Sequence, residues 1–68
     1  MDEERFNISL RKLLKQFGIT AQREVEKAVY AGLESGSLAG RQSLPARVTM
    51  RIEGLATEVV VEGRIELG

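Results

Sequence analysis

Three glutamates, Glu58, Glu62 and Glu66, recur at every fourth position near the end of the chain. On a β-strand this spacing places all three on one face, and a row of carboxylates can bind a cation. Two of them, however, fall opposite arginines in the strand pairing proposed below. The pattern therefore favours a solvated sheet face with paired charges over a metal site.

Other residues suited to catalysis are scarce. The chain has no His and no Cys, so it lacks the commonest general base and the thiolate nucleophile. Disulfides are excluded, and zinc and haem lose their usual ligands. The segment "GSLAG" at 36–40 is too short for a phosphate-binding loop and no lysine follows it. The sequence predicts a protein that is not an enzyme and binds no metal or cofactor.

Contact with phosphate groups is the second chemistry to consider. Residues 18–20, "GIT", resemble the turn of a helix-turn-helix, and basic side chains flank them: Arg11, Lys12, Lys15 and Arg23. Ten basic residues balance ten acidic ones, however, whereas nucleic-acid-binding domains are usually basic. Glu24 also stands where that motif has an apolar residue. A small helix-turn-helix-like nucleic-acid-binding regulator is therefore kept as the alternative function.

One helical segment is expected before the turn at residues 18–20 and a second one after it. The first is expected over residues 3–17, capped by Asp2 and ended by Gly18. Its apolar residues form one stripe at helical spacing: Phe6, Leu10, Leu13, Leu14 and Phe17. The second is expected over residues 21–35, capped by Thr20, with a stripe made by Ala21, Val25, Ala28, Val29, Gly32 and Leu33. We expect the two stripes to bury against each other.

After a loop at 36–45, the apolar period changes from 3.6 to 2, which indicates a β-hairpin over residues 46–67. A two-residue type II′ turn at Gly54-Leu55 fixes the register. Val48 then pairs with Val61 and Met50 with Val59 on the face towards the helices, together with Ile52. Arg47 pairs with Glu62 and Arg51 with Glu58 on the other face. A slip of one residue would destroy both agreements.

These elements predict a single α+β domain over residues 1–68, in the order α-α-β-β, with two amphipathic helices packed on an antiparallel β-hairpin. Chains below about 70–80 residues rarely bury enough core to be stable without a disulfide, a metal or a partner subunit. Self-association is the stabiliser still open to this chain. The segment 64–67 also has strand alternation but no partner, because Pro45 interrupts the first strand. We therefore expect a homo-oligomer, most simply a dimer, joined partly through its β-structure.

Two apolar residues depart from the helical stripes. Ile8 lies opposite the first stripe, and Tyr30 lies among charged side chains on the second helix. Single exposed apolar residues are common, but aromatic residues are enriched at binding hot spots. The candidate interaction surface therefore consists of Ile8, Tyr30, Arg64, Ile65 and Leu67. The sequence therefore predicts a non-catalytic protein–protein interaction module that self-associates.

The run "FNISLRKLLKQFGITAQREVEKAV" resembles the front of a small family of uncharacterised bacterial, mainly proteobacterial, proteins of about this length. The resemblance covers residues 1–33 strongly and the "LPA…EGL…VEG.IEL" tail more loosely. It implies a cytoplasmic protein and supplies no catalytic or ligand residues. The sequence agrees, with no signal-peptide pattern and no apolar run long enough for a membrane span.

Overall fold

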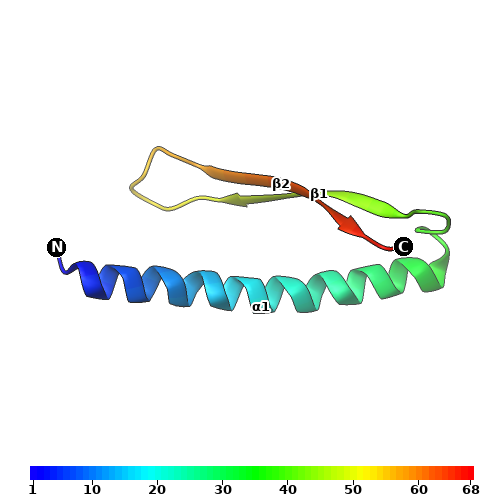
Figure 1. The fold of residues 1–68 in the computed structure, drawn as a ribbon, viewed down its shortest axis with the longest axis horizontal. Helices are drawn as coiled ribbons and strands as arrows, with labels where there is room; N and C mark the ends of the chain where they lie inside the picture. The colour runs from blue at the N-terminus through cyan, green and yellow to red at the C-terminus, as the bar shows by residue number, and fades with distance from the viewer.

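The computed structural model describes all 68 residues as one long helix followed by a two-stranded antiparallel sheet (Figure 1). Helix α1 spans Glu3–Ser35, strand β1 spans Ser43–Met50 and strand β2 spans Val59–Glu66. The element order is therefore α-β-β, and the predicted α-α-β-β fold with two packed helices is wrong. The molecule is 51 Å long, close to the roughly 50 Å that 33 helical residues span.

The predicted break at Gly18 is absent because nothing in that segment is strong enough to end a helix. Gly18 does not have a positive φ, unlike Gly36, Gly40 and Gly54, and residues 18–20 are helical. A glycine costs a helix about 1 kcal/mol relative to alanine and a threonine less, whereas proline costs about 3 kcal/mol. Phe17 and Ala21 are also four residues apart, so the two predicted stripes join into one.

The two ends of α1 are where the sequence places them. The Asp2 side chain caps the start by accepting a hydrogen bond from the Arg5 N–H, at 3.1 Å. Gly36 ends the helix in the left-handed conformation, at φ 87°, and its N–H donates to the Leu33 carbonyl. The chain then folds back so closely that a Cβ atom on Gly32 would lie 2.7 Å from the Leu38 side chain. Gly32 thus makes room for the loop.

The hairpin has the predicted register. Val48 pairs with Val61, Met50 with Val59 and Arg47 with Glu62. The two-residue turn is wrong, because the strands separate after Met50 and the loop runs over residues 51–58. Within that loop the Leu55 N–H donates to the Ile52 carbonyl at 3.1 Å, and Gly54 has φ 92°. This is the third position of a four-residue turn, where a type II turn requires positive φ.

The segment that lacked a partner in our sequence analysis is paired within the chain. β1 begins at Ser43, three residues before the predicted start, and Arg64 pairs with Pro45 and Ile65 with Leu44. Pro45 is tolerated because its nitrogen faces the free edge of β1, where no ladder hydrogen bond is made. The Leu67 N–H continues the ladder by donating to the Gln42 carbonyl at 2.8 Å.

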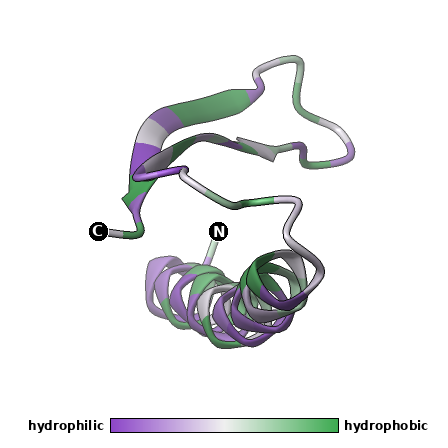
Figure 2. Cartoon of the chain, turned by 90° about the vertical axis from the view of Figure 1, so that its right-hand side faces the viewer, coloured by the Kyte–Doolittle hydropathy of each residue, from purple (hydrophilic) through white to green (hydrophobic).

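Helix and hairpin form two layers that lie side by side (Figures 1 and 2). No Cα atom of either strand comes within 8 Å of a Cα atom of α1, and none of the 68 residues is buried. The predicted packing of residues 6–17 against residues 25–33 is also wrong, because both groups lie along one straight helix. A filled core is therefore missing from the single chain.

Candidate interaction surface

The hairpin presents an apolar face to α1. Alternate residues of the paired strands share this face: Leu44, Ala46, Val48, Met50, Val59, Val61 and Ile65. Its β1 half is partly covered, with Leu44, Ala46 and Met50 half-buried, but every residue of β2 is exposed. Val61 is 61% exposed, and Ile52, which we expected on this face, is exposed in the loop. The face is thus only half covered by its own helix.

Two open grooves mark the poorly filled space between the layers. One, of about 270 Å³, is lined by Leu13, Leu14 and Phe17 of α1 and by residues 48–51 of the hairpin. The other, of about 340 Å³, lies nearer the C-terminal end of the helix and brings Tyr30 together with residues 65–67. A folded core of packed side chains normally leaves few voids larger than a water molecule.

Of the five candidate interaction residues, the structure places Tyr30, Ile65 and Leu67 around one groove. Ile8 lies near the N-terminal end of α1, far from this groove. Arg64 belongs to the outer face of the hairpin, where its guanidinium donates to the Ser43 Oγ atom at 3.1 Å. The predicted surface is therefore three places on the molecule and not one.

The size of the uncovered surface can be compared with that of ordinary proteins. The chain exposes 6266 Å², whereas a folded monomer of its 7.5 kDa mass exposes about 4,200 Å². Its radius of gyration is 16.0 Å, against about 11 Å for a compact domain of this length. The excess of about 2,000 Å² per chain falls in the range that obligate protein–protein interfaces bury.

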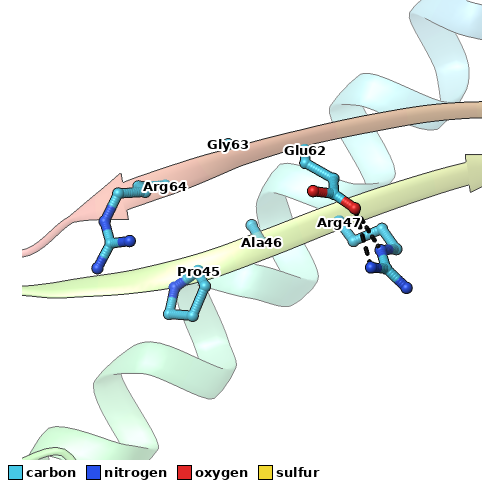
Figure 3. Close-up of a pocket in the computed structure, with 6 residues that line it drawn as sticks. All are labelled: Pro45, Ala46, Arg47, Glu62, Gly63 and Arg64. Atoms are coloured by element: carbon cyan, nitrogen blue, oxygen red, sulfur yellow. Dashed lines mark hydrogen bonds and ion pairs between the residues drawn. The ribbon is translucent and has the colours of Figure 1, made fainter.

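The outer face of the hairpin is mostly polar, and Arg47 lies against Glu62 on it (Figure 3). Arg47 and Glu62 form an ion pair at 2.8 Å between Nη2 and Oε1, and Arg51 and Glu58 form another at 3.2 Å. The predicted cross-strand pairing of Arg47 with Glu62 is confirmed, and Arg51 and Glu58 form their predicted ion pair in the loop, beyond the last pair of the strands. No group of three or more His, Cys, Asp or Glu side chains is placed to hold a metal ion.

One exposed apolar residue of α1 was not predicted as part of the candidate surface, because it lies in the segment predicted to be a turn. Ile19 is 53% exposed on α1, eleven residues from both Ile8 and Tyr30. Eleven residues make about three helical turns, so Ile8, Ile19 and Tyr30 lie on one line along the helix. The eleven-residue spacing is visible in the sequence, but it has meaning only if the helix is continuous.

The candidate phosphate contacts, Arg11, Lys12, Lys15 and Arg23, all lie on α1. The helix-turn-helix that was to present them does not exist, because residues 18–20 are helical. Residues 5–23 nevertheless contain five basic side chains and no acidic one. No part of α1 combines the length and the apolar character needed to cross a membrane.

Comparison with known proteins gives the family alone. No curated protein and no solved structure matches the chain. The sequence profile of a family of unknown function, DUF6494, matches residues 1–68. The expected resemblance to a family of uncharacterised proteins of about this length is therefore confirmed, and the chain belongs to the family of unknown function DUF6494.

Proposed function

We propose that this protein is a non-catalytic protein–protein interaction module that self-associates, and that its hydrophobic core forms between subunits. The observation that carries the proposal is that none of its 68 residues is buried, although its apolar residues are ordered into a helix stripe and a sheet face. Such surfaces are unfavourable in water, and soluble monomers rarely expose apolar patches above a few hundred Å².

The amount of excess surface supports a second copy as the partner. About 2,000 Å² per chain is more than a standard interface of about 800 Å² per partner and suits an obligate dimer. A homodimer supplies two helices and four strands, whereas a two-stranded hairpin is stable only when a helix packs against it, and α1 leaves every residue of β2 exposed. We further propose that this module works in the cytoplasm, which is what its resemblance to small bacterial proteins implies.

The test is the mass of the protein in solution. Light scattering or sedimentation over a hundredfold concentration range should give a mass of about twice 7.5 kDa, with helical circular dichroism that falls on dilution. A mass of 7.5 kDa at the highest concentration, with the helix intact, would overturn self-association.

Nucleic-acid binding is the alternative, and the acid-free basic stretch 5–23 favours it. Five cations spaced along one helix could contact successive phosphates, and such binding weakens steeply as salt is added. Fluorescence anisotropy with a labelled DNA duplex tests this alternative. The titration is done at about 50 mM and about 200 mM salt, because binding through phosphate contacts weakens steeply over that range. No binding at the lower salt removes the alternative.

A further inference from the structure

The two edges of the hairpin differ in their ability to accept another strand. Hydrogen-bonded and non-hydrogen-bonded pairs alternate along an antiparallel ladder. Because the Leu67 N–H bonds to the Gln42 carbonyl, the odd-numbered residues of β2 bond to β1. The even-numbered residues of β2 therefore point their backbone N–H and C=O groups towards its free edge.

On β1 the residues that face the free edge are the odd-numbered ones, and Pro45 is among them. Proline has no N–H to donate, so an added strand on this edge would lose the ladder hydrogen bond opposite Pro45. β2 has no proline, and all eight of its residues are exposed. An exposed edge of this length is a template for another strand unless it is blocked.

We propose that β2 pairs with β2 of a second copy, antiparallel and centred on Gly63, to form a four-stranded sheet in the order β1-β2-β2-β1. This inference rests on the proposed self-association and names its register. Two-fold symmetry about an axis normal to the sheet keeps both helices on one side of it. It also requires that some residue of β2 lie opposite its own copy.

Only the registers centred on Glu62 and on Gly63 pair seven of the eight β2 residues, and the charges that each register places opposite each other decide between them. With Glu62 at the centre, two carboxylates lie directly opposite each other, which is destabilising. With Gly63 at the centre, Glu62 lies opposite Arg64 of the second copy, and this attraction occurs twice. Val61 then lies opposite Ile65 on the apolar face.

Gly63 itself suits the centre of this arrangement. It pairs with Ala46 through β1 hydrogen bonds, so across the free edge it forms a non-hydrogen-bonded pair, whose Cα atoms approach to about 4.5 Å. Its missing side chain leaves the symmetry axis uncrowded. Within one chain nothing requires a glycine here, since an added Cβ would meet no atom within 4 Å.

Charge reversal tests the register. Arg64→Glu places Glu62 of one copy against a carboxylate of the other, and Glu62→Arg places two guanidinium groups together. Each variant alone should dimerise about tenfold more weakly or worse, since two attractions become two repulsions. An equimolar mixture should recover the wild-type affinity, because in the mixed dimer both contacts are attractive again. Arg23→Glu, the same charge change on α1, is the matched control and should leave dimerisation unchanged.

A cysteine supplies the second measurement. The chain has no Cys, so in Gly63→Cys the only possible disulfide joins two copies, at a Cα separation that a disulfide can bridge. We expect rapid oxidation to a covalent dimer for Gly63→Cys and slow oxidation for Thr49→Cys on the β1 edge.

The outcomes separate the two proposals. If the wild-type protein is a dimer but neither charge reversal weakens it and Thr49→Cys cross-links faster, the β2 register is wrong and self-association stands. If the wild-type protein is a monomer at every concentration, both are wrong. Recovery in the mixture would show that each variant folds, so loss of association cannot be ascribed to misfolding.

Discussion

The hairpin and α1 are held in place by different kinds of interaction. In the hairpin, eight residue pairs join the two strands, the ion pair of Arg47 and Glu62 crosses between them, and the ion pair of Arg51 and Glu58 lies just beyond the last pair. In α1 the stabilising contacts are local, and no Cα atom of a strand lies within 8 Å of a Cα atom of the helix. The pairing of the two strands is therefore fixed within one chain, whereas the apolar stripe of the helix has no surface of the same chain packed closely against it.

This difference matters because helices in proteins draw most of their stability from packing of an apolar face. A helix of 33 residues with a continuous stripe and no buried residue is half of such a packing arrangement. On our proposal the second copy supplies the other half. Variants that act on only one of the two regions test this difference between α1 and the hairpin.

The largest effect is expected on the helix stripe. Leu14→Ala should destabilise the assembled protein by about 2–5 kcal/mol, since it removes a side chain that becomes buried between subunits. Ile8→Ala removes a side chain of the same size, 59% exposed on another side of the same helix, and should cost less than about 0.5 kcal/mol. Urea denaturation at several protein concentrations measures both.

Equal and small losses for the two variants would mean that the stripe is as exposed in solution as it is in the single chain. That result would contradict a core formed between subunits, and it would leave the helix stabilised by its own hydrogen bonds alone.

A smaller effect of known sign distinguishes one helix from two. Gly18→Ala should stabilise the protein by about 0.5–1 kcal/mol, because alanine is the better residue inside a helix and its Cβ meets no atom within 4 Å. Gly36→Ala is the control and should destabilise by about 1 kcal/mol, because Gly36 has φ 87°. Thermal denaturation followed at the helix signal decides. Destabilisation by both variants would restore a break at Gly18.

The register of the hairpin could be predicted because it is checked twice by the sequence. Moving one strand by a single residue would separate Val48 from Val61 and Arg47 from Glu62 at the same time. The predicted two-residue turn was wrong, and the register could not reveal this, because a tight turn and an eight-residue loop preserve the same strand pairing. The prediction that Pro45 interrupts the first strand was wrong, because an edge strand tolerates proline when its nitrogen faces outward.

The continuous helix was harder to predict than the hairpin register, because the local signals for a helix end and a helix start opposed the apolar periodicity that runs through them. Gly18 and Thr20 match the end of one helix and the start of the next, yet together they cost less than one proline. The four-residue step from Phe17 to Ala21 was the better signal. The same error scattered the candidate surface, since Ile8 and Tyr30 are related through Ile19 only on a continuous helix.

Thr20 gives a further test of the helix with a smaller effect. As a helix cap its side chain would be needed, and Thr20→Ala would cost about 1 kcal/mol. Inside a continuous helix the same change should stabilise by about 0.5 kcal/mol, since alanine loses less side-chain freedom. Asp2→Ala, at the true cap, should destabilise by about 1 kcal/mol. Loss of stability in both variants would contradict the structure at Thr20.

The smallest effects are expected in the hairpin, where they compare two ion pairs. Arg47 and Glu62 lie within the ladder and are joined by two hydrogen bonds, through Nε and Nη2 of the arginine. Arg51 and Glu58 lie beyond its last pair, and Arg51 is 80% exposed. Double-mutant cycles to alanine should give coupling energies below about 0.5 kcal/mol for both, because exposed charges are well solvated. The coupling should be larger for Arg47 and Glu62, since the paired strands already hold these side chains opposite each other. Raising the salt concentration should weaken both couplings. A larger coupling for Arg51 and Glu58 would mean that the loop over residues 51–58 is more ordered in solution than the paired strands, and the hairpin's register would then depend on its loop.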